Sequence, residues 1–274
     1  MKTLELEITD LCNEKCLHCY QPEKKEKGLL KDLDKLDTLF AEFGDIGFIH
    51  AVITGGEPLL HPKFKEICKL AQKNRYLISI KTNGTLIDDN LVEFFKELKP
   101  RTVEMSLYSA DKEEHDFITR VSGSFEMTIN GLKKLKKAGV KCSVMTPVLK
   151  GVKHWKELFY LMKEMNVPWG CSQNIHSSFD ERAEVEEFKG TSESYIDFLE
   201  FVNELEGQKI NNVDNLCFKE CQGGVSTVCV APDYSVRACI SFPETAGIYT
   251  GGNAEELLKK ARTQLEERFA KLEC

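Results

Sequence analysis

The sequence predicts an α/β fold built on a parallel sheet, and three observations lead to this prediction. Strand-like segments of period two alternate with helix-like segments along residues 1–206. The helical segments are about 10–15 residues long, as in the crossovers that join parallel strands. Beyond residue 206 the alternation gives way to short, cysteine-rich segments. Six strand–helix pairs result, and their periodicity allows either a partial barrel or a flat, doubly wound sheet.

Each element follows from the spacing of its apolar residues. Residues 3–9 alternate apolar and polar side chains as a half-buried strand does. Residues 32–43 place five apolar side chains on one helical face. The same two patterns predict strands at 48–53, 77–81, 103–107, 140–148 and 169–175 and helices at 64–72, 89–98, 125–138, 155–165 and 192–206.

A second, smaller region is predicted from residue 207 onward. Its first part, residues 207–252, is rich in turns and cysteines. Asn253 is then expected to cap a final helix that has apolar residues on one face. We therefore expect one domain over residues 1–206 and another over residues 207–274, with the boundary near residues 206–212.

Composition and charge exclude several classes of protein. The 274 residues carry 37 Lys and Arg against 44 Asp and Glu, a net charge of -7 at pH 7, so no nucleic-acid partner is expected. No apolar run reaches the roughly 18–20 residues of a membrane span, and no signal peptide opens the chain. The expected location is therefore the cytoplasm. Eleven cysteines in such a protein indicate metal ligation or redox chemistry rather than a disulfide framework.

The strongest motif is a CxxxCxxC run, Cys12, Cys16 and Cys19, directly after the first predicted strand. Three thiolates on one loop can hold three irons of a [4Fe–4S] cluster and leave the fourth iron open to a small molecule, whereas ferredoxin clusters take a fourth cysteine. The alternatives are a partial zinc site or three unrelated thiols, although zinc normally takes four ligands.

A second motif, Gly55, Gly56, Glu57 and Pro58, ends the second predicted strand. The glycines would let the backbone approach a ligand closely, and Glu57 would place a carboxylate beside it. Taken alone, the four residues also fit an ordinary turn between a strand and a helix.

Together the two motifs resemble those of the radical S-adenosylmethionine (SAM) superfamily. The resemblance implies a partial (β/α)6 barrel of the TIM type, with the cluster at the mouth formed by the loops that follow the strands. It also implies that SAM chelates the open iron and that one electron, from a donor such as flavodoxin or ferredoxin, cleaves the sulfonium. This cleavage would give methionine and a 5′-deoxyadenosyl radical, and the radical would abstract hydrogen from a substrate.

The resemblance assigns roles to further residues. His18 matches the position that lies against the adenine of SAM, and Glu57 matches the acceptor of the methionyl amine. Asn83, which is also part of a turn signal, and Ser106 match the polar strand ends near the ribose and the carboxylate. Arg120 would pair with the SAM carboxylate, although the usual Arg-Gly step reads Thr-Arg here.

The C-terminal cysteines resemble those of the SPASM and Twitch extensions, which bind auxiliary [4Fe–4S] clusters. Cys217, Cys221 and Cys239 match three ligands of such a cluster. Cys274 is either the fourth ligand or the first of several cysteines in a longer chain. Cys229 is additional and is expected to be a buried thiol.

Three cysteines belong to neither group. Cys68 lies on the apolar side of a predicted helix and is expected in the core. Cys142 and Cys171 fall on predicted strands, where a thiol facing the cavity would be able to donate hydrogen to a substrate radical. The alternative for both is a small buried hydrophobic side chain.

The leading functional hypothesis is a radical SAM enzyme that matures a ribosomally made peptide by crosslinking, epimerisation or side-chain oxidation. Because the first strand starts near residue 3, peptide recognition would require a separate protein or direct docking in the barrel. One alternative is the same chemistry on a small molecule such as a tetrapyrrole side chain or a sugar. Another is a non-catalytic iron–sulfur electron carrier. Candidate lining residues near the predicted strand ends are Tyr20, Tyr108, Trp169, His176 and Asp180.

Overall fold

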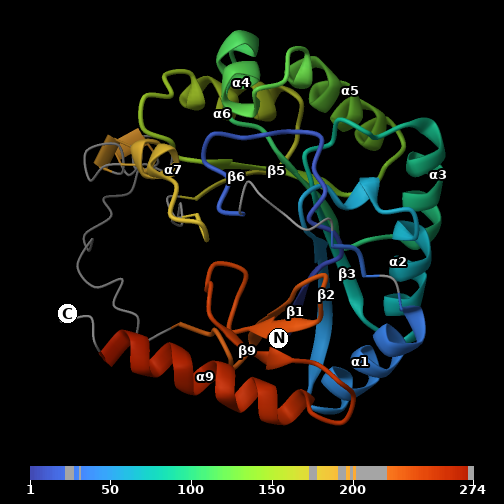
Figure 1. The fold of residues 1–274 in the computed structure, drawn as a ribbon. Helices are drawn as coiled ribbons and strands as arrows, with labels where there is room; N and C mark the ends of the chain where they lie inside the picture. Colours follow the sequence, from blue (N-terminus) through green and yellow to red (C-terminus); the bar gives the residue numbers. More distant parts are fainter. Residues whose placement is uncertain are drawn as a thin grey trace.

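The computed structural model describes residues 1–21, 28–30, 32–172, 178–190, 196–197, 200–201 and 221–270. Among these residues, nine strands form one sheet in the order β6-β5-β4-β3-β2-β1-β7-β8-β9. The first six strands are parallel and follow one another in chain order. A doubly wound sheet would reverse its order after the first half, so the partial barrel is confirmed. Figure 1 shows the curved sheet with helices α1, α2, α3 and α5 outside it.

The bounds of the elements agree with the predicted ones to within three residues where both exist. The first six strands are β1 (Lys2–Glu7), β2 (Phe48–Thr54), β3 (Leu77–Thr82), β4 (Thr102–Ser106), β5 (Cys142–Pro147) and β6 (Trp169–Ser172). The accompanying helices are α1 (Leu33–Asp45), the short η1 (Pro58–Leu60), α2 (Phe64–Lys73), α3 (Asp89–Leu98), α4 (Lys112–Thr119), α5 (Ser124–Lys137), α6 (Trp155–Glu164) and α7 (Ala183–Glu187).

Helices α4 and α7 are described in the structure but absent from the predictions. Helix α4 is not predicted, because its eight residues, KEEHDFIT, carry too few apolar side chains for a recognisable face. It begins after Asp111, whose carboxylate accepts a hydrogen bond from Glu114 N at 2.8 Å. Strand β6 is described from Trp169 to Ser172, and the rest of its predicted range and most of the helix predicted at 192–206 lie outside the described residues.

The two faces of the sheet differ in polarity. Leu4, Leu6 and their neighbours in register pack against the helices in one apolar core. Because side chains alternate along a strand, Glu5 and Glu7 point to the inner face, away from the helices. Glu5 is in register with Val52 on β2 and Cys229 on β7. The inner face therefore carries buried charge directly below the loop that leaves β1.

The C-terminal strands continue the same sheet. Strand β7 (Thr227–Val230) pairs in parallel with β1, whereas β8 (Ser235–Arg237) and β9 (Thr245–Ile248) are antiparallel. Helix α9 (Ala254–Ala270) packs on β9 and α1 and shares the apolar core. The predicted boundary at 206/207 lies outside the described residues and remains a prediction. None of the described helices is long and apolar enough to cross a membrane.

The start of α9 is held differently from the prediction. Asn253 does precede the helix, but its side-chain oxygen accepts from Thr250 N at 3.0 Å instead of from the helix. The carboxylate of Glu42, on α1, accepts from Gly252 N at 2.5 Å and Ala254 N at 3.4 Å. A distant carboxylate thus supplies the negative charge that a helix N-terminus favours.

Candidate functional site

The three cysteines of the first motif lie on the loop after β1, and the Gly-Gly-Glu segment after β2 holds the start of that loop. Gly56 N donates to Thr9 O, and Glu57 N donates to Leu11 O, both at 2.7 Å. A Cβ on Gly55 would lie 2.2 Å from Thr9 O, and one on Gly56 would lie 2.3 Å from Leu11 O. The glycines therefore allow close approach, as predicted, but the partner is the backbone leading into Cys12.

The Glu57 carboxylate is completely buried and joins two strand ends. One oxygen accepts from Leu59 N at 3.0 Å and from Thr82 Oγ1 at 2.7 Å. The other accepts from Asn83 N at 2.8 Å. Burial raises the pKa of Glu57 to about 7, although these donors favour the charged form. These three bonds leave one acceptor site of the carboxylate, on Oε2, unused, and the role of Glu57 toward a methionyl amine remains a prediction.

Polar residues after β3 bind the other side of the cysteine loop. Asn83 Nδ2 donates to Asn13 Oδ1 at 2.9 Å, and Asn13 Nδ2 donates to Thr85 Oγ1 at 2.8 Å. Thr128, on α5, donates through its hydroxyl to Asn83 O at 2.9 Å. Asn83 therefore positions the residue next to Cys12, and its predicted contact with SAM is not tested by these bonds.

The second half of the loop rests on α4 and on the segment after β6. Lys15 N and Leu17 N donate to the last carbonyls of α4, at Thr119 and Ile118, over 3.1 and 2.9 Å. These bonds satisfy carbonyls that a helix end leaves free. From the other side, Arg182 Nη2 donates to Cys19 O at 2.6 Å and to Gln21 O at 2.7 Å.

The Cys19 thiol lies close enough to those of Cys12 and Cys16 to help raise their pKa values. Although Cys12 as a residue is exposed, partial desolvation of its thiol raises the pKa to about 12, and Glu57, Glu14 and Cys19 add to the shift. Burial raises the pKa of Cys16 well above its usual range, with contributions from Glu14, Cys19 and Cys12. Iron ligation requires deprotonated thiols, so a bound cation would have to offset this cost.

The donor set suits a cluster better than a single ion. Within the described ranges, no three His, Cys, Asp or Glu side chains converge as ligands of one metal ion. In an iron–sulfur cluster each thiolate binds a different iron, so Cys12, Cys16 and Cys19 need only surround it. Glu14 N also donates to Cys12 Sγ at 3.4 Å, a bond that stabilises a thiolate. The residues present therefore fit a [4Fe–4S] cluster.

A buried stack of rings lies behind Cys16. His18 meets Tyr108 edge-to-face at 4.7 Å, and Tyr108 stacks on His115 at 5.3 Å. Tyr108 Oη lies 3.8 Å from Cys16 Sγ and also hydrogen-bonds the Ser106 side chain. Burial lowers the pKa of His18 and of His115 to about 4, so both rings are neutral at pH 7. The predicted roles of His18 and Ser106 toward SAM remain predictions.

Four residues at the site make contacts that the sequence did not predict, although Tyr108 is one of the candidate lining residues. Glu14, inside the cysteine motif, is 6% exposed and accepts from Cys16 Sγ at 3.4 Å. In the sequence it stands between two cysteines as a charged residue and resembles an exposed side chain of a loop. In the sequence, only the position of Tyr108 and His115 after β4 distinguishes them from ordinary core residues. Arg182 comes from a different segment, and nothing in its local sequence indicates contact with Cys19.

Other predicted residues lie elsewhere or at the edge of the site. Arg120 is exposed and ends α4 in a left-handed conformation with φ 57°, so its predicted pairing with SAM remains a prediction. Cys142 and Cys171 are in register with Val103 and Thr146, on strands whose Val144 packs in the helix-facing core. The hydrogen-donor hypothesis requires a thiol that faces the interior of the barrel. Neither Cys142 nor Cys171 does so, because both lie on the same face as Val144. That hypothesis is corrected by the alternation of side chains along β5 and β6.

The inner face of β1 links this site to the C-terminal region. Tyr20 Oη donates to Glu7 Oε1 at 2.9 Å, and Arg237 forms a buried ion pair with the same carboxylate. Arg237 Nη2 also donates to Cys229 Sγ at 3.2 Å. Cys229 is fully buried, as expected. Glu5 accepts from Ile240 N at 2.9 Å, which fixes the residue after Cys239.

The second cysteine group is described only in part. Burial raises the pKa of the Cys239 thiol, and the Cys221 thiol adds a smaller contribution; both side chains pack against the same apolar core. Arg262, on α9, donates to Cys221 O at 2.9 Å. The predicted ligands Cys217 and Cys274 lie outside the described residues, as does the candidate lining residue His176. Cys68 is buried in the core, as predicted.

A curved sheet of parallel βα units, with three cysteines on the loop after its first strand, defines a cluster-binding α/β barrel. The family model of the Radical SAM superfamily matches residues 6–166, which is more than half of the chain. The chain therefore belongs to the radical SAM superfamily. This family implies a [4Fe–4S] cluster and SAM as cofactors.

Curated relatives match the chain at moderate identity. The antilisterial bacteriocin subtilosin biosynthesis protein AlbA of Bacillus subtilis (strain 168) is 25% identical over 245 residues, 87% of this chain and 54% of AlbA. An AdoMet-dependent heme synthase of Methanosarcina barkeri is 30% identical over 162 residues, 58% of this chain and 46% of the synthase. The chain thus spans about half the length of these relatives.

Solved structures share the fold along nearly the whole chain. Streptococcus suis SuiB bound to the precursor peptide SuiA superposes with a TM-score of 0.73 at 16% identity, covering 94% of this chain and 64% of SuiB. Native anSMEcpe with bound AdoMet and the Kp18Cys peptide gives a TM-score of 0.75 at 21% identity, covering 97% of this chain and 83% of that one. The structural similarity therefore includes the C-terminal region, whose cysteines resemble those of SPASM and Twitch extensions.

Proposed function

We propose that this chain is an enzyme that reductively cleaves SAM and uses the radical formed to abstract hydrogen from a ribosomally made peptide. The observation that carries the proposal is the loop of Cys12, Cys16 and Cys19, held by the Gly55–Glu57 backbone. When bound, the cluster and SAM supply one-electron cleavage of the sulfonium to methionine and a 5′-deoxyadenosyl radical.

The residues of this chain would then position the cofactors and exclude water. The three thiolates would hold the cluster, and the bonds from Asn83 and Arg182 would fix the two ends of their loop. The rings of His18 and Tyr108 would form a dry wall beside Cys16. Preorganised polar groups of this kind cost no reorganisation at the moment of reaction.

The extent of the matches favours a peptide over a small molecule. The match to AlbA, a bacteriocin biosynthesis protein, extends over 87% of the chain. The match to the heme synthase stops at 58%. SuiB and anSMEcpe, both solved with peptides, also superpose on the C-terminal strands and helix. The second candidate, a tetrapyrrole or similar small molecule, is supported by the 30% identity to the heme synthase.

An auxiliary cluster is part of the proposal. Cys221 and Cys239 lie near one another beside β8, and with Cys217 they would supply three of its thiolates. Burial raises the pKa of Cys239, but the backbone N–H groups of Ser241 and Phe242 donate to its sulfur and favour the thiolate. The proposed fourth ligand is Cys274.

The deciding experiment uses anaerobically reconstituted protein, SAM and dithionite, with 5′-deoxyadenosine measured by chromatography. We expect formation well above that of a Cys12→Ala control, which should still retain iron in an auxiliary cluster. No 5′-deoxyadenosine above the control would leave only the electron-carrier hypothesis. Mass spectrometry of a candidate peptide, compared with a porphyrin substrate, would then separate the two substrate classes.

A further inference from the structure

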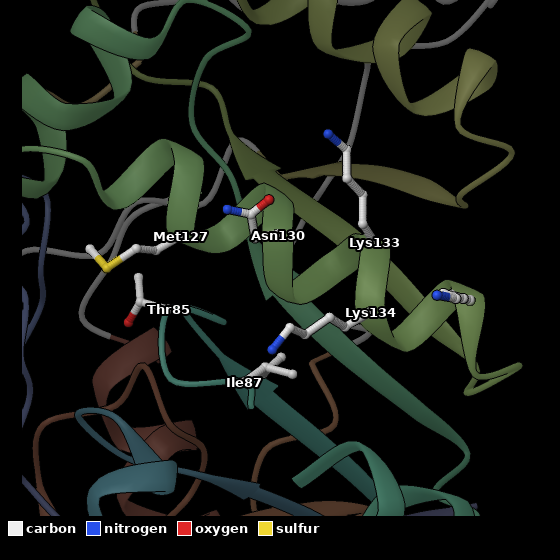
Figure 2. Close-up of a pocket in the computed structure, with 7 residues that line it drawn as sticks. Thr85, Ile87, Met127, Asn130, Lys133 and Lys134 are labelled. Carbon is white, nitrogen blue, oxygen red and sulfur yellow. The ribbon is translucent and has the colours of Figure 1, made fainter. Parts of the chain in front are cut away.

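A basic hollow lies on the outer surface between α5 and the loop after β3. Its volume is about 420 Å³, and Figure 2 shows its lining side chains on both elements. Ile87 and Met127 give it apolar surface, and Thr85 and Asn130 add polar groups. The remaining lining residues are all lysines: Lys133, Lys134 and Lys137.

The charge of this hollow is opposite to that of the chain. The whole chain has a net charge of -7, so three lysines around one hollow form a local positive field. Lys134 pairs with Asp89 at 2.9 Å. Lys133 and Lys137 are exposed and form no ion pair with any residue that the structure describes. They are therefore available to an anionic partner.

One hydrogen bond connects the hollow to the cysteine loop. Thr85, in its lining, accepts from Asn13 Nδ2 at 2.8 Å. Asn13 is the neighbour of Cys12, and both residues are exposed. A protein seated in the hollow would thus lie next to the first cluster ligand.

We propose that this hollow is the docking surface for an acidic one-electron carrier protein that reduces the cluster. The inference rests on the proposed function, because SAM cleavage requires one electron. In the step itself the carrier loses one electron and the cluster gains it, with no bond formed or broken. Lys133 and Lys137 would attract acidic residues around the carrier's redox centre, and Met127, which is 39% exposed, would supply apolar contact.

The position of the hollow favours a carrier over the substrate. Helix α5 lies in the outer layer, with the sheet between it and the inner face (Figure 1). A substrate has to reach the open ends of the strands, where the cofactors would lie. An electron carrier needs only to approach a cluster ligand from outside, and Cys12 is exposed.

The test measures how fast reduced flavodoxin, an acidic carrier, reduces the reconstituted protein, by stopped-flow absorbance at several salt concentrations. The variant is Lys133→Glu with Lys137→Glu. The matched control is Lys69→Glu with Lys260→Glu, which changes the net charge equally at exposed positions on α2 and α9. We expect the second-order rate constant to fall about tenfold or more in the test variant at low salt, and the difference to shrink at high salt.

Three outcomes decide the proposal. An equal loss in the control, or no loss in the test variant, would overturn it. Unchanged flavodoxin kinetics with weaker binding of an acidic candidate peptide would assign the hollow to the substrate and also overturn it. Dithionite-driven 5′-deoxyadenosine formation should be the same in all variants. If the wild type forms none, the proposed function fails, whereas salt-dependent reduction by flavodoxin would still support the docking surface.

Discussion

The two cysteine regions of this chain are built in different ways. The first places all three predicted ligands on one short loop, and residues of α4 and of the segments after β2, β3 and β6 hold it. The second brings Cys221 and Cys239 together through long-range packing, with Gly224 N bonded to Ala238 O at 2.9 Å. A candidate ligand set on one loop, supported by distant atoms, thus contrasts with a candidate ligand set that is itself assembled by the fold.

The largest expected effect separates the two regions. Cys16→Ser should reduce SAM cleavage to background, because it removes a proposed ligand of the SAM-binding cluster. Cys239→Ser should retain SAM cleavage and lose only peptide modification. Both are measured as 5′-deoxyadenosine and modified peptide per protein, with iron content as the check on loading. Complete loss of SAM cleavage in Cys239→Ser would show that the second region also supports the first.

The next effect concerns the ion pair that connects the regions. Arg237, on β8, is buried against Glu7 of β1. Arg237→Met should lower the free energy of unfolding by about 3–5 kcal/mol, because it leaves a carboxylate buried without its partner. Adding Glu7→Gln should recover part of that loss in anaerobic urea titrations. If the double variant is as unstable as the single one, the cost comes from lost packing at Arg237.

These contrasts explain how far the sequence allowed prediction. The period-two and helical patterns predicted six strands and most helices, because burial alone determines their spacing. Cys12, Cys16 and Cys19 were predictable because one loop carries them all. Glu57 was found as a motif residue, but its bonds to Thr82 and Asn83 depend on the neighbouring strand. Cys142 and Cys171 were assigned a possible role in the cavity because the side that a buried strand residue faces is set by register, which the sequence does not show.

A pH effect tests the packing behind the first loop. His115 is 1% exposed, and burial lowers its pKa from 6.5 to about 4. The unfolded chain binds the proton first, so stability is present above pH 6.5 and is lost as the pH falls toward 4. Between pH 7 and pH 5 the wild type should lose about 2 kcal/mol more than His115→Asn, which keeps an acceptor for Tyr108 N. If urea titrations show that the wild type and His115→Asn lose the same free energy of unfolding between pH 7 and pH 5, then folding does not lower the pKa of His115.

The smallest expected effect acts on the cluster without removing it. Tyr108 Oη lies 3.8 Å from Cys16 Sγ, and a hydrogen bond to a ligand sulfur stabilises the more negative, reduced cluster. Tyr108→Phe should therefore lower the reduction potential while iron content stays the same, at a cost in stability of about 1 kcal/mol. The matched control is Tyr234→Phe, which removes a hydroxyl bonded to Asp32 O at 2.8 Å, far from Cys16 in the chain and on the C-terminal hairpin. A redox titration that shows the same potential in both variants would reduce Tyr108 to a packing residue. A shift in Tyr108→Phe alone would show that this hydroxyl adjusts the potential of the cluster proposed for the first region, as the N–H groups of Ser241 and Phe242 would do at the Cys239 sulfur of the second.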